Sequence, residues 1–241
     1  MKLSERLQYI ADEIQKGETM ADIGTDHGFL PLYLLEKKKC PKVIMADISP
    51  GSLKKAEINL KLVKPKGDYE LRLGDGIDVL SDREVDVVVI AGMGGLLIAD
   101  ILEWNLHKSR SVRRYILQPR NNPGKLRHWL LLNGFSIVKE GIVREGKFLC
   151  EIFTVESGEK PVWSDKNPRP SYSAEFDYPE SLLFYDSPLL EEYLSRHLET
   201  ECRILGKIKE NAKNVQLQGA SVQARIDRLS ALLERCQKKY E

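Results

Sequence analysis

The first 158 residues alternate β-branched apolar runs with stretches of helical periodicity, and this alternation limits the possible folds more than any other feature. The strongest run, residues 85–90, reads Val-Asp-Val-Val-Val-Ile and predicts a central strand buried on both faces. Strands that alternate with helices form parallel, doubly wound sheets. Strands are expected at residues 19–23, 42–47, 69–73, 85–90, 114–117, 135–140 and 148–155, and helices at 3–14, 29–38, 52–63, 95–103 and 125–132.

Only a short turn around Glu145-Gly146 separates the last two of these strands, so they must pair antiparallel. The predicted fold class is therefore α/β, a Rossmann-like doubly wound sheet that is mostly parallel with an antiparallel last strand. A C-terminal helical hairpin is expected in addition.

The remainder of the chain consists of two segments that differ in composition. Residues 159–188 contain five prolines and predict a linker that crosses the surface. Residues 189–241 contain no proline and predict two long helices. The second helix has an apolar stripe with spacings of 4, 3, 4, 3 and 4, as in a coiled coil. The residues of the stripe are Val222, Ile226, Leu229, Leu233, Cys236 and Tyr240.

A break at Gln218-Gly219 is expected to let the two helices fold back as an antiparallel hairpin. The alternative is a pair of ordinary helices packed on the main domain. The chain is thus divided into a catalytic domain at residues 1–158, a linker at 159–188 and a coiled-coil hairpin at 189–241.

Charge and composition exclude several classes of protein. With 37 basic and 36 acidic side chains the net charge is +1, so a nucleic-acid partner would need local basic patches. No apolar run approaches the roughly 20 residues of a membrane-spanning helix, and the N-terminus lacks the apolar stretch of a signal peptide. The four cysteines are far apart and suggest reduced thiols in the cytoplasm. No metal site and no membrane association are expected.

The turn after the first strand, residues 22–28, reads Asp-Ile-Gly-Thr-Asp-His-Gly. Its glycines, Gly24 and Gly28, permit a tight turn and close approach of a ligand. A pyrophosphate needs bare amides, and the carboxylates of Asp22 and Asp26 would repel it. They suit a cofactor with positive charge, and S-adenosylmethionine has a sulfonium and an ammonium group. His27 completes the predicted cofactor-binding turn; the alternative for this residue is a helix cap.

An alternative for this turn needs no ligand: Asp22 would cap the turn and Asp26 the next helix. The following strand ends favour the cofactor. Asp47 ends the second strand, where an acidic side chain can bind ribose hydroxyls. The carboxyl ends of parallel strands border one crevice, so this site is extended to the residues that follow the second, third and fourth strands. These residues are Ile48, Asp75, Gly76, Ala91 and Gly92.

The fourth and fifth strand ends are expected to border the reacting atoms. Met93 and Gly94 belong to a glycine-rich stretch that leaves bare backbone beside the transferred methyl group. Gln118 and Asn121 follow the fifth strand and offer amide groups suited to a base edge. The alternative is a polar loop that caps the next helix. Basic side chains on the same side predict RNA contacts, made together with Asn121 by Arg114, Arg120, Lys125 and Arg127.

Five blocks of this sequence resemble the bacterial tRNA (adenine-22-N1)-methyltransferases. They are Leu-Ser-Glu-Arg-Leu at 3–7, Met-Ala-Asp-Ile-Gly-Thr-Asp-His-Gly-Phe-Leu-Pro at 20–31, Gly-Asp-Gly at 74–76, Ile-Ala-Gly-Met-Gly-Gly at 90–95 and Ile-Leu-Gln-Pro at 116–119. The resemblance implies a Rossmann-like domain, a coiled-coil hairpin, a cofactor adenine contacted by Asp75, and methylation of adenine N1 in the tRNA D-arm. One position departs from the family, which tends to have Asn where this chain has Arg120.

The implied reaction needs no base, because adenine N1 already has a lone pair. Alignment and electrostatics can supply catalysis, and a carboxylate would stabilise the cationic product. Asp26 is the candidate for this role, unless it only holds cofactor; Met93, Gly94 and Gln118 complete the predicted catalytic set. Two rivals remain: a methyltransferase for a small molecule or protein, and a non-catalytic module that assembles through its coiled coil. The expected state is a monomer or weak dimer.

Overall fold

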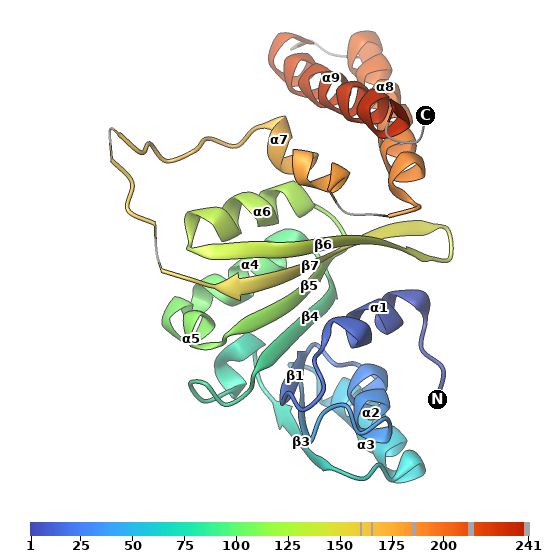
Figure 1. Cartoon of the computed structure of the whole chain (residues 1–241), viewed down its shortest axis with the longest axis vertical. Coiled ribbons are helices and arrows are strands. Elements are labelled where there is room, and N and C mark those ends of the chain that lie inside the picture. The colour runs from blue at the N-terminus through green and yellow to red at the C-terminus, as the bar shows by residue number, and fades with distance from the viewer. Residues whose placement is uncertain (160, 165, 185–186, 212–214, 239–241) are drawn as a thin grey trace.

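The computed structural model describes residues 1–159, 161–164, 166–184, 187–211 and 215–238, without the side chains of 211–218. A seven-stranded sheet runs through the middle of the molecule in the order β3-β2-β1-β4-β5-β7-β6 (Figure 1). Its strands are β1 (Met20–Ile23), β2 (Lys42–Asp47), β3 (Asp68–Leu73), β4 (Val87–Met93), β5 (Arg114–Pro119), β6 (Phe135–Glu145) and β7 (Phe148–Ser157).

The pairing confirms the predicted fold class. β1 pairs parallel with β2 and β4, β4 pairs parallel with β5, and only β7 runs antiparallel to its neighbours β5 and β6. β1 and β4 are neighbours, although β2 and β3 come between them in the chain. The strand order therefore reverses beside β1, and this is where α/β sheets form a ligand crevice.

Helices cover both faces of the sheet because alternate strand residues point to opposite sides. Val87 and Val89 belong to the core under the first three helices, whereas Val88 and Ile90 belong to the core under the next group. The first group comprises α1 (Glu5–Glu13), α2 (Phe29–Glu36) and α3 (Pro50–Val63). The second comprises the 3-10 helix η1 (Gly76–Val79), α4 (Gly95–Trp104), α5 (Leu106–Ser111) and α6 (Pro123–Leu132).

The short helix α5 has no counterpart among the predicted elements. It begins at Asn105, whose side chain accepts a hydrogen bond from the Lys108 N–H at 3.2 Å. A six-residue helix is too short for its apolar period to be seen, so the capping residue was the available signal.

The proline-rich segment 159–188 contains structure that the linker prediction did not include. It forms α7 (Ala174–Asp177) and the 3-10 helix η2 (Glu180–Leu183). Tyr178, Leu182 and Leu183 are buried in a third core that also contains residues of the C-terminal helices. This part of the segment therefore packs against its neighbours instead of only crossing the surface. The division of the chain into three domains remains a prediction.

The C-terminal helices α8 (Leu190–Asn211) and α9 (Val215–Lys238) lie side by side beyond the β6 edge of the sheet (Figure 1). They are antiparallel, because Glu201 pairs with Arg225 and Gln237 donates to Glu191. The prediction of a turn at Gln218-Gly219 was wrong, since α9 runs through both residues. A helical glycine costs only about 1 kcal/mol, so packing can override it. Tyr240, at the end of the expected stripe, lies outside the described residues.

Candidate active site

A cavity of about 320 Å³ lies at the carboxyl ends of the central strands, in the predicted crevice. It is lined by residues of α1, of β1 and the turn after it, of the first turn of α2, of the ends of β2 and β4, and by Arg120 just after β5. The lining residues are Arg6, Leu7, Asp22, Gly24, Thr25, Asp26, His27, Phe29, Leu30, Asp47, Ala91, Gly92, Met93 and Arg120. Predicted cofactor residues from three strand ends thus meet in one cavity.

Asp22 forms the buried end of the β1–α2 turn. Its carboxylate accepts a hydrogen bond from the Thr25 hydroxyl at 2.7 Å, and only 8% of the residue is exposed. Burial raises the pKa of this carboxyl to about 6, against the opposing effects of the Thr25 hydrogen bond and the Arg6 charge. Asp22 is therefore mainly ionised at neutral pH and close to titrating.

Gly24 is required where this turn meets the end of β4. Its φ is +79°, and a Cβ there would lie 2.1 Å from Met93 Cε. Any side chain would both strain the backbone and displace Met93. The glycine therefore brings the β1 turn and the β4 end together around the cavity.

Asp26 is anionic and ion-paired. Its Oδ1 atom accepts from Lys55 Nζ at 2.9 Å, and its Oδ2 atom lies 3.4 Å from His27 Nε2. The Lys55 hydrogen bond is the largest cause that lowers the pKa of Asp26. Asp26 does not cap α2, because that helix begins at Gly28 with no side-chain cap. The His27 ring stacks on the partly exposed Phe29, with the ring centres 5.2 Å apart.

Asp47 and Ile48 are neighbours in the sequence, but only Asp47 lines the cavity. Asp47 lines the cavity, and its Oδ1 atom accepts the Ser49 N–H at 2.8 Å. The Asp26 N–H approaches the other oxygen, Oδ2, at 3.4 Å. Ile48 is 68% exposed and does not line this cavity. The contact of Ile48 with the cofactor remains a prediction.

Asp75 and Gly76 are not part of the main cavity. They line a smaller one, of about 140 Å³, together with Ile101 and Trp104. This second cavity lies between the turn after β3 and helix α4, again at the carboxyl ends of the strands. The predicted cofactor residues are therefore divided between two cavities.

The glycine-rich end of β4 serves two purposes. Gly92 lines the cavity with φ +78°, whereas Gly94 and Gly95 begin α4 outside the lining. A Cβ on Gly95 would lie 2.6 Å from the Asn122 carbonyl oxygen, so this glycine permits close contact with the β5–α6 loop. Gly94, which was predicted to be catalytic, is the N-cap residue of α4.

Gln118 does not offer its amide to a base edge, and that prediction is corrected. The residue is 1% exposed. Its Oε1 atom accepts from the Gly92 N–H at 3.0 Å and from Arg6 Nη1 at 3.2 Å, and its Nε2 atom donates to the Pro119 carbonyl at 2.9 Å. Buried amides are normally satisfied within the protein, and here they fix the cavity wall. Gln118 therefore positions other residues.

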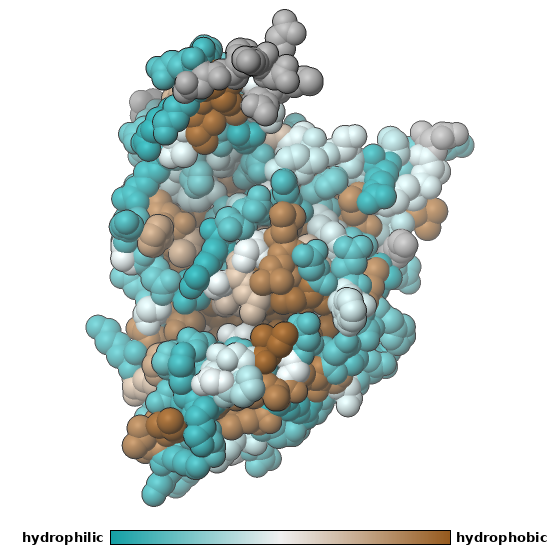
Figure 2. All heavy atoms as spheres, turned by 180° about the vertical axis from the view of Figure 1, so that it is seen from behind, coloured by the Kyte–Doolittle hydropathy of each residue, from teal (hydrophilic) through white to brown (hydrophobic). Residues whose placement is uncertain are grey.

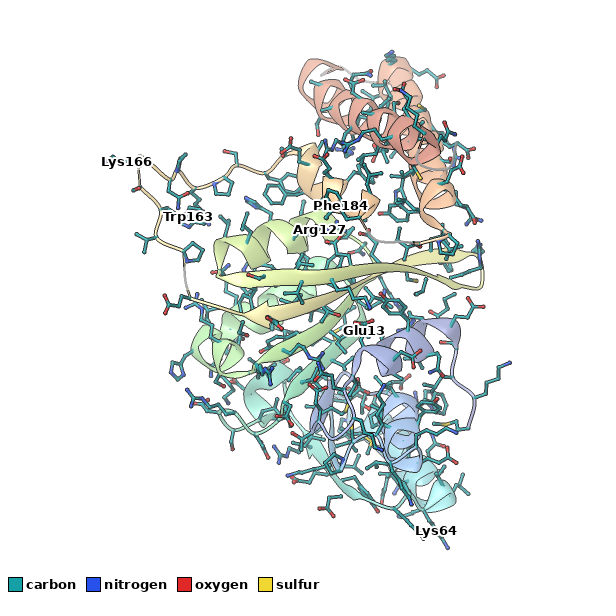
Figure 3. All side chains as sticks on the ribbon, in the orientation of Figure 1. Glu13, Lys64, Arg127, Trp163, Lys166 and Phe184 are labelled. Atoms are coloured by element: carbon teal, nitrogen blue, oxygen red, sulfur yellow. The ribbon has the colours of Figure 1, made fainter. Side chains whose placement is uncertain are left out.

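Two of the predicted RNA contacts are also corrected. Arg127 is 5% exposed and its guanidinium pairs with Glu140 and Glu151 beneath α7. Figure 3 labels it between α6 and the ribbon that leads to α8. Arg114 is buried at the opposite end of β5 and pairs with Glu18. Charge alone suggested an RNA surface, but both guanidinium groups are used within the fold.

The remaining three predicted RNA contacts are exposed residues that follow β5. Arg120 lines the cavity, and its side chain is exposed. Asn121 is exposed, and its carbonyl accepts the Gly95 N–H at 2.9 Å. Lys125 is exposed in the first turn of α6. Their contact with RNA remains a prediction.

Sequence reasoning missed two cationic residues of the site. Arg6 reaches the cavity from α1 and donates to Glu145 at 2.6 Å and to Gln118. Lys55 reaches Asp26 from α3. Arg6 lies in the Leu-Ser-Glu-Arg-Leu block at 3–7, which carried the family resemblance and was the available signal. Nothing in the sequence marks Lys55, because the contact joins residues 29 positions apart.

The described parts of the chain offer neither a metal centre nor a membrane-spanning helix. No cluster of three or more His, Cys, Asp or Glu residues there could hold a metal ion. No helix there is both long and apolar enough to cross a bilayer. Seen from behind, apolar atoms gather in the middle of the molecule and hydrophilic ones surround them (Figure 2).

The reversed strand order and the acidic glycine turn define a class I S-adenosylmethionine-dependent methyltransferase. Residues 3–153 match the family described as Methyltransferase domain. The chain is 36% identical over 160 residues to tRNA (adenine(22)-N(1))-methyltransferase of Bacillus subtilis (strain 168), across 66% of this chain and 67% of that protein.

Two solved structures extend the likeness over the C-terminal helices. The m1A22 tRNA methyltransferase of B. subtilis has a TM-score of 0.81 and 29% identity, covering 96% of this chain and 99% of its own. A putative tRNA (m1A22) methyltransferase of Streptococcus pneumoniae, in complex with S-adenosyl-L-methionine, has a TM-score of 0.80 and 29% identity, covering 96% and 100%. This chain belongs to the tRNA (adenine(22)-N(1))-methyltransferase family.

Proposed function

We propose that this chain transfers the methyl group of S-adenosylmethionine to N1 of adenine 22 in tRNA. The similarity to the B. subtilis enzyme of that activity carries the proposal, and the solved structure of that enzyme matches 96% of this chain. We further infer that the protein works in the cytoplasm, where tRNA is present, as a monomer or weak dimer.

The charges in the cavity fit the cofactor. When bound, S-adenosylmethionine supplies a methyl group on a positively charged sulfur atom. Asp22 and Arg6 lie in the same wall, close enough for Arg6 to lower the pKa of Asp22, and together they match the ammonium and carboxylate of an amino acid. Asp47 would bind ribose hydroxyls. A pyrophosphate would meet three carboxylates here, which excludes the usual dinucleotide arrangement.

The reaction at adenine N1 requires alignment more than proton transfer. N1 has a free lone pair, so no residue has to remove a proton first. The ionised Asp26 can stabilise the positive charge that develops on the base, although Lys55 already neutralises part of its charge. The exposed face of the His27–Phe29 stack offers an apolar surface for a base that has left its helix.

Methyl transfer from labelled S-adenosylmethionine to unmodified tRNA tests this function, with nucleoside analysis of the product. We expect 1-methyladenosine as the labelled nucleoside. Label in another nucleoside, or transfer to protein or small molecules but not to tRNA, would contradict the proposal. A tRNA that is already methylated at this adenine serves as the control and should accept no label.

A further inference from the structure

Arg120 is held over the part of the cavity where β4 ends. Its backbone N–H donates to the Met93 carbonyl at 2.7 Å, which fixes its Cα at the end of β5. Its Nε and Nη2 atoms lie 3.7 Å from the position that a Cβ on Gly92 would occupy. The guanidinium therefore lies beside the bare backbone of Gly92, and Arg120 is an exposed residue.

Arg120 differs from the other arginine of the cavity in having no carboxylate partner among the residues that the structure describes. Arg6 is fixed by Glu145 and Gln118. Buried or partly buried arginines elsewhere, such as Arg72 and Arg127, are also ion-paired. A guanidinium without a partner, beside a cavity that has three carboxylates, is available to an anion from outside.

The proposed substrate brings such an anion. A tRNA strand that enters an acidic cavity brings its phosphates toward Asp22, Asp26 and Asp47, and like charges repel. A net charge of +1 gives no general attraction to compensate. At least one cation at the opening of the cavity is therefore needed. Arg6 does not fill this role, because it donates to Glu145 and Gln118 within the cavity wall and is assigned to the carboxylate of the cofactor.

From this placement we infer that Arg120 binds the phosphodiester of the target nucleotide, and so holds the adenine in the cavity. The inference rests on the proposed tRNA substrate. A planar guanidinium can donate two parallel hydrogen bonds to one phosphate, so it fixes orientation as well as position. Arg120 is thus a substrate-positioning residue that acts on the RNA strand and has no part in binding the cofactor.

The experiment compares Arg120→Ala and Arg120→Lys with Arg113→Ala. Arg113 is the matched control, because it is an exposed arginine just before β5 while Arg120 lies just after it. Binding of unmodified tRNA is measured over a range of salt concentrations, for tRNA with adenine 22 and tRNA with guanine 22. Binding of S-adenosylmethionine is measured by calorimetry, and 1-methyladenosine formation gives kcat and KM.

We expect Arg120→Ala to weaken binding of both tRNAs about tenfold and to reduce the salt slope by about 1, because a phosphate contact is independent of sequence. Arg120→Lys should restore part of the affinity, and Arg113→Ala should change it less than twofold. Cofactor affinity should stay the same. Unchanged tRNA binding, weakening for adenine 22 alone, or a loss confined to cofactor affinity would each overturn the inference. If the unmodified chain forms no 1-methyladenosine, the proposed function itself fails.

Discussion

The side-chain oxygen of Gln118 accepts the backbone N–H of Gly92 at 3.0 Å, which fixes the end of β4 to the end of β5. The same oxygen accepts a hydrogen bond from Arg6 at 3.2 Å, so three separate segments meet at one amide. The wall of the cavity therefore depends on a residue that neither cofactor nor RNA can reach. Gln118 therefore positions the cavity wall and does not bind substrate.

Replacing Gln118 with Leu should lower the free energy of unfolding by about 1–3 kcal/mol, because the Gly92 N–H and Arg6 lose a buried acceptor. Cofactor affinity should fall as well. Urea unfolding and calorimetry measure the two effects. A variant of normal stability and normal cofactor affinity, with weaker tRNA binding alone, would show that Gln118 contacts the base after all.

Asp26→Asn should lower kcat about tenfold or more, because a neutral amide cannot offset the positive charge on the methylated base. Single-turnover methyl transfer measures this effect. Lys55→Gln is the matched variant, because it removes the counter-ion and leaves the carboxylate in place, so it should not lower kcat. If Asp26→Asn instead abolishes cofactor binding, Asp26 only holds cofactor.

Binding of S-adenosylmethionine should weaken between pH 7 and pH 5. The pKa of Asp22 is raised to about 6, so the carboxylate that attracts the ammonium group is protonated as the pH falls through that value. At pH 5 the affinity should be about tenfold lower than at pH 7. Calorimetry at each pH measures the change. The Asp22→Asn variant should bind the cofactor weakly at every pH, with no fall in affinity near pH 6. The His27→Gln variant should keep that fall. If the affinity of Asp22→Asn still falls near pH 6, Asp22 is not the group that titrates.

Arg127→Met should lower the free energy of unfolding by about 3–5 kcal/mol. The change leaves Glu140 and Glu151 as buried carboxylates without their cation, and Tyr193 of α8 already donates to Glu151 at 2.6 Å. Loss of the bonds from Arg127 to the Phe176 and Asp177 carbonyls should also loosen α7. Urea unfolding measures the effect. If the variant has full stability but binds tRNA more weakly, Arg127 contacts RNA and the prediction is wrong.

The sequence predicts those parts of the fold and site that depend on local pattern. Strand–helix alternation is enough to predict the sheet, and the position of Asp22, Asp26 and Asp47 at or just after the ends of successive strands is enough to bring them together. The same reasoning cannot predict the direction of a polar side chain. Gln118 lies at the correct strand end, but it turns inward because Gly92 and Arg6 need an acceptor.

Arg127 and the break between the last two helices show a second reason why the sequence alone predicted some features wrongly. Arg127 of α6 is buried because Glu140 of β6 and Glu151 of β7, 13 and 24 residues further on, converge on it. A glycine at position 219 suggests a turn, yet α9 continues through it. In both cases tertiary contacts outweigh a local preference, and a single sequence does not show which contacts form.

Primer extension on tRNA treated with the unmodified chain and S-adenosylmethionine tests the central claim most directly, since a methyl group on N1 blocks base pairing and stops the polymerase. The account predicts a new stop at adenine 22 that depends on cofactor and is absent when that adenine is replaced by guanine. A stop at another nucleotide, or no stop while label still enters the RNA, would contradict methylation of N1 at this position.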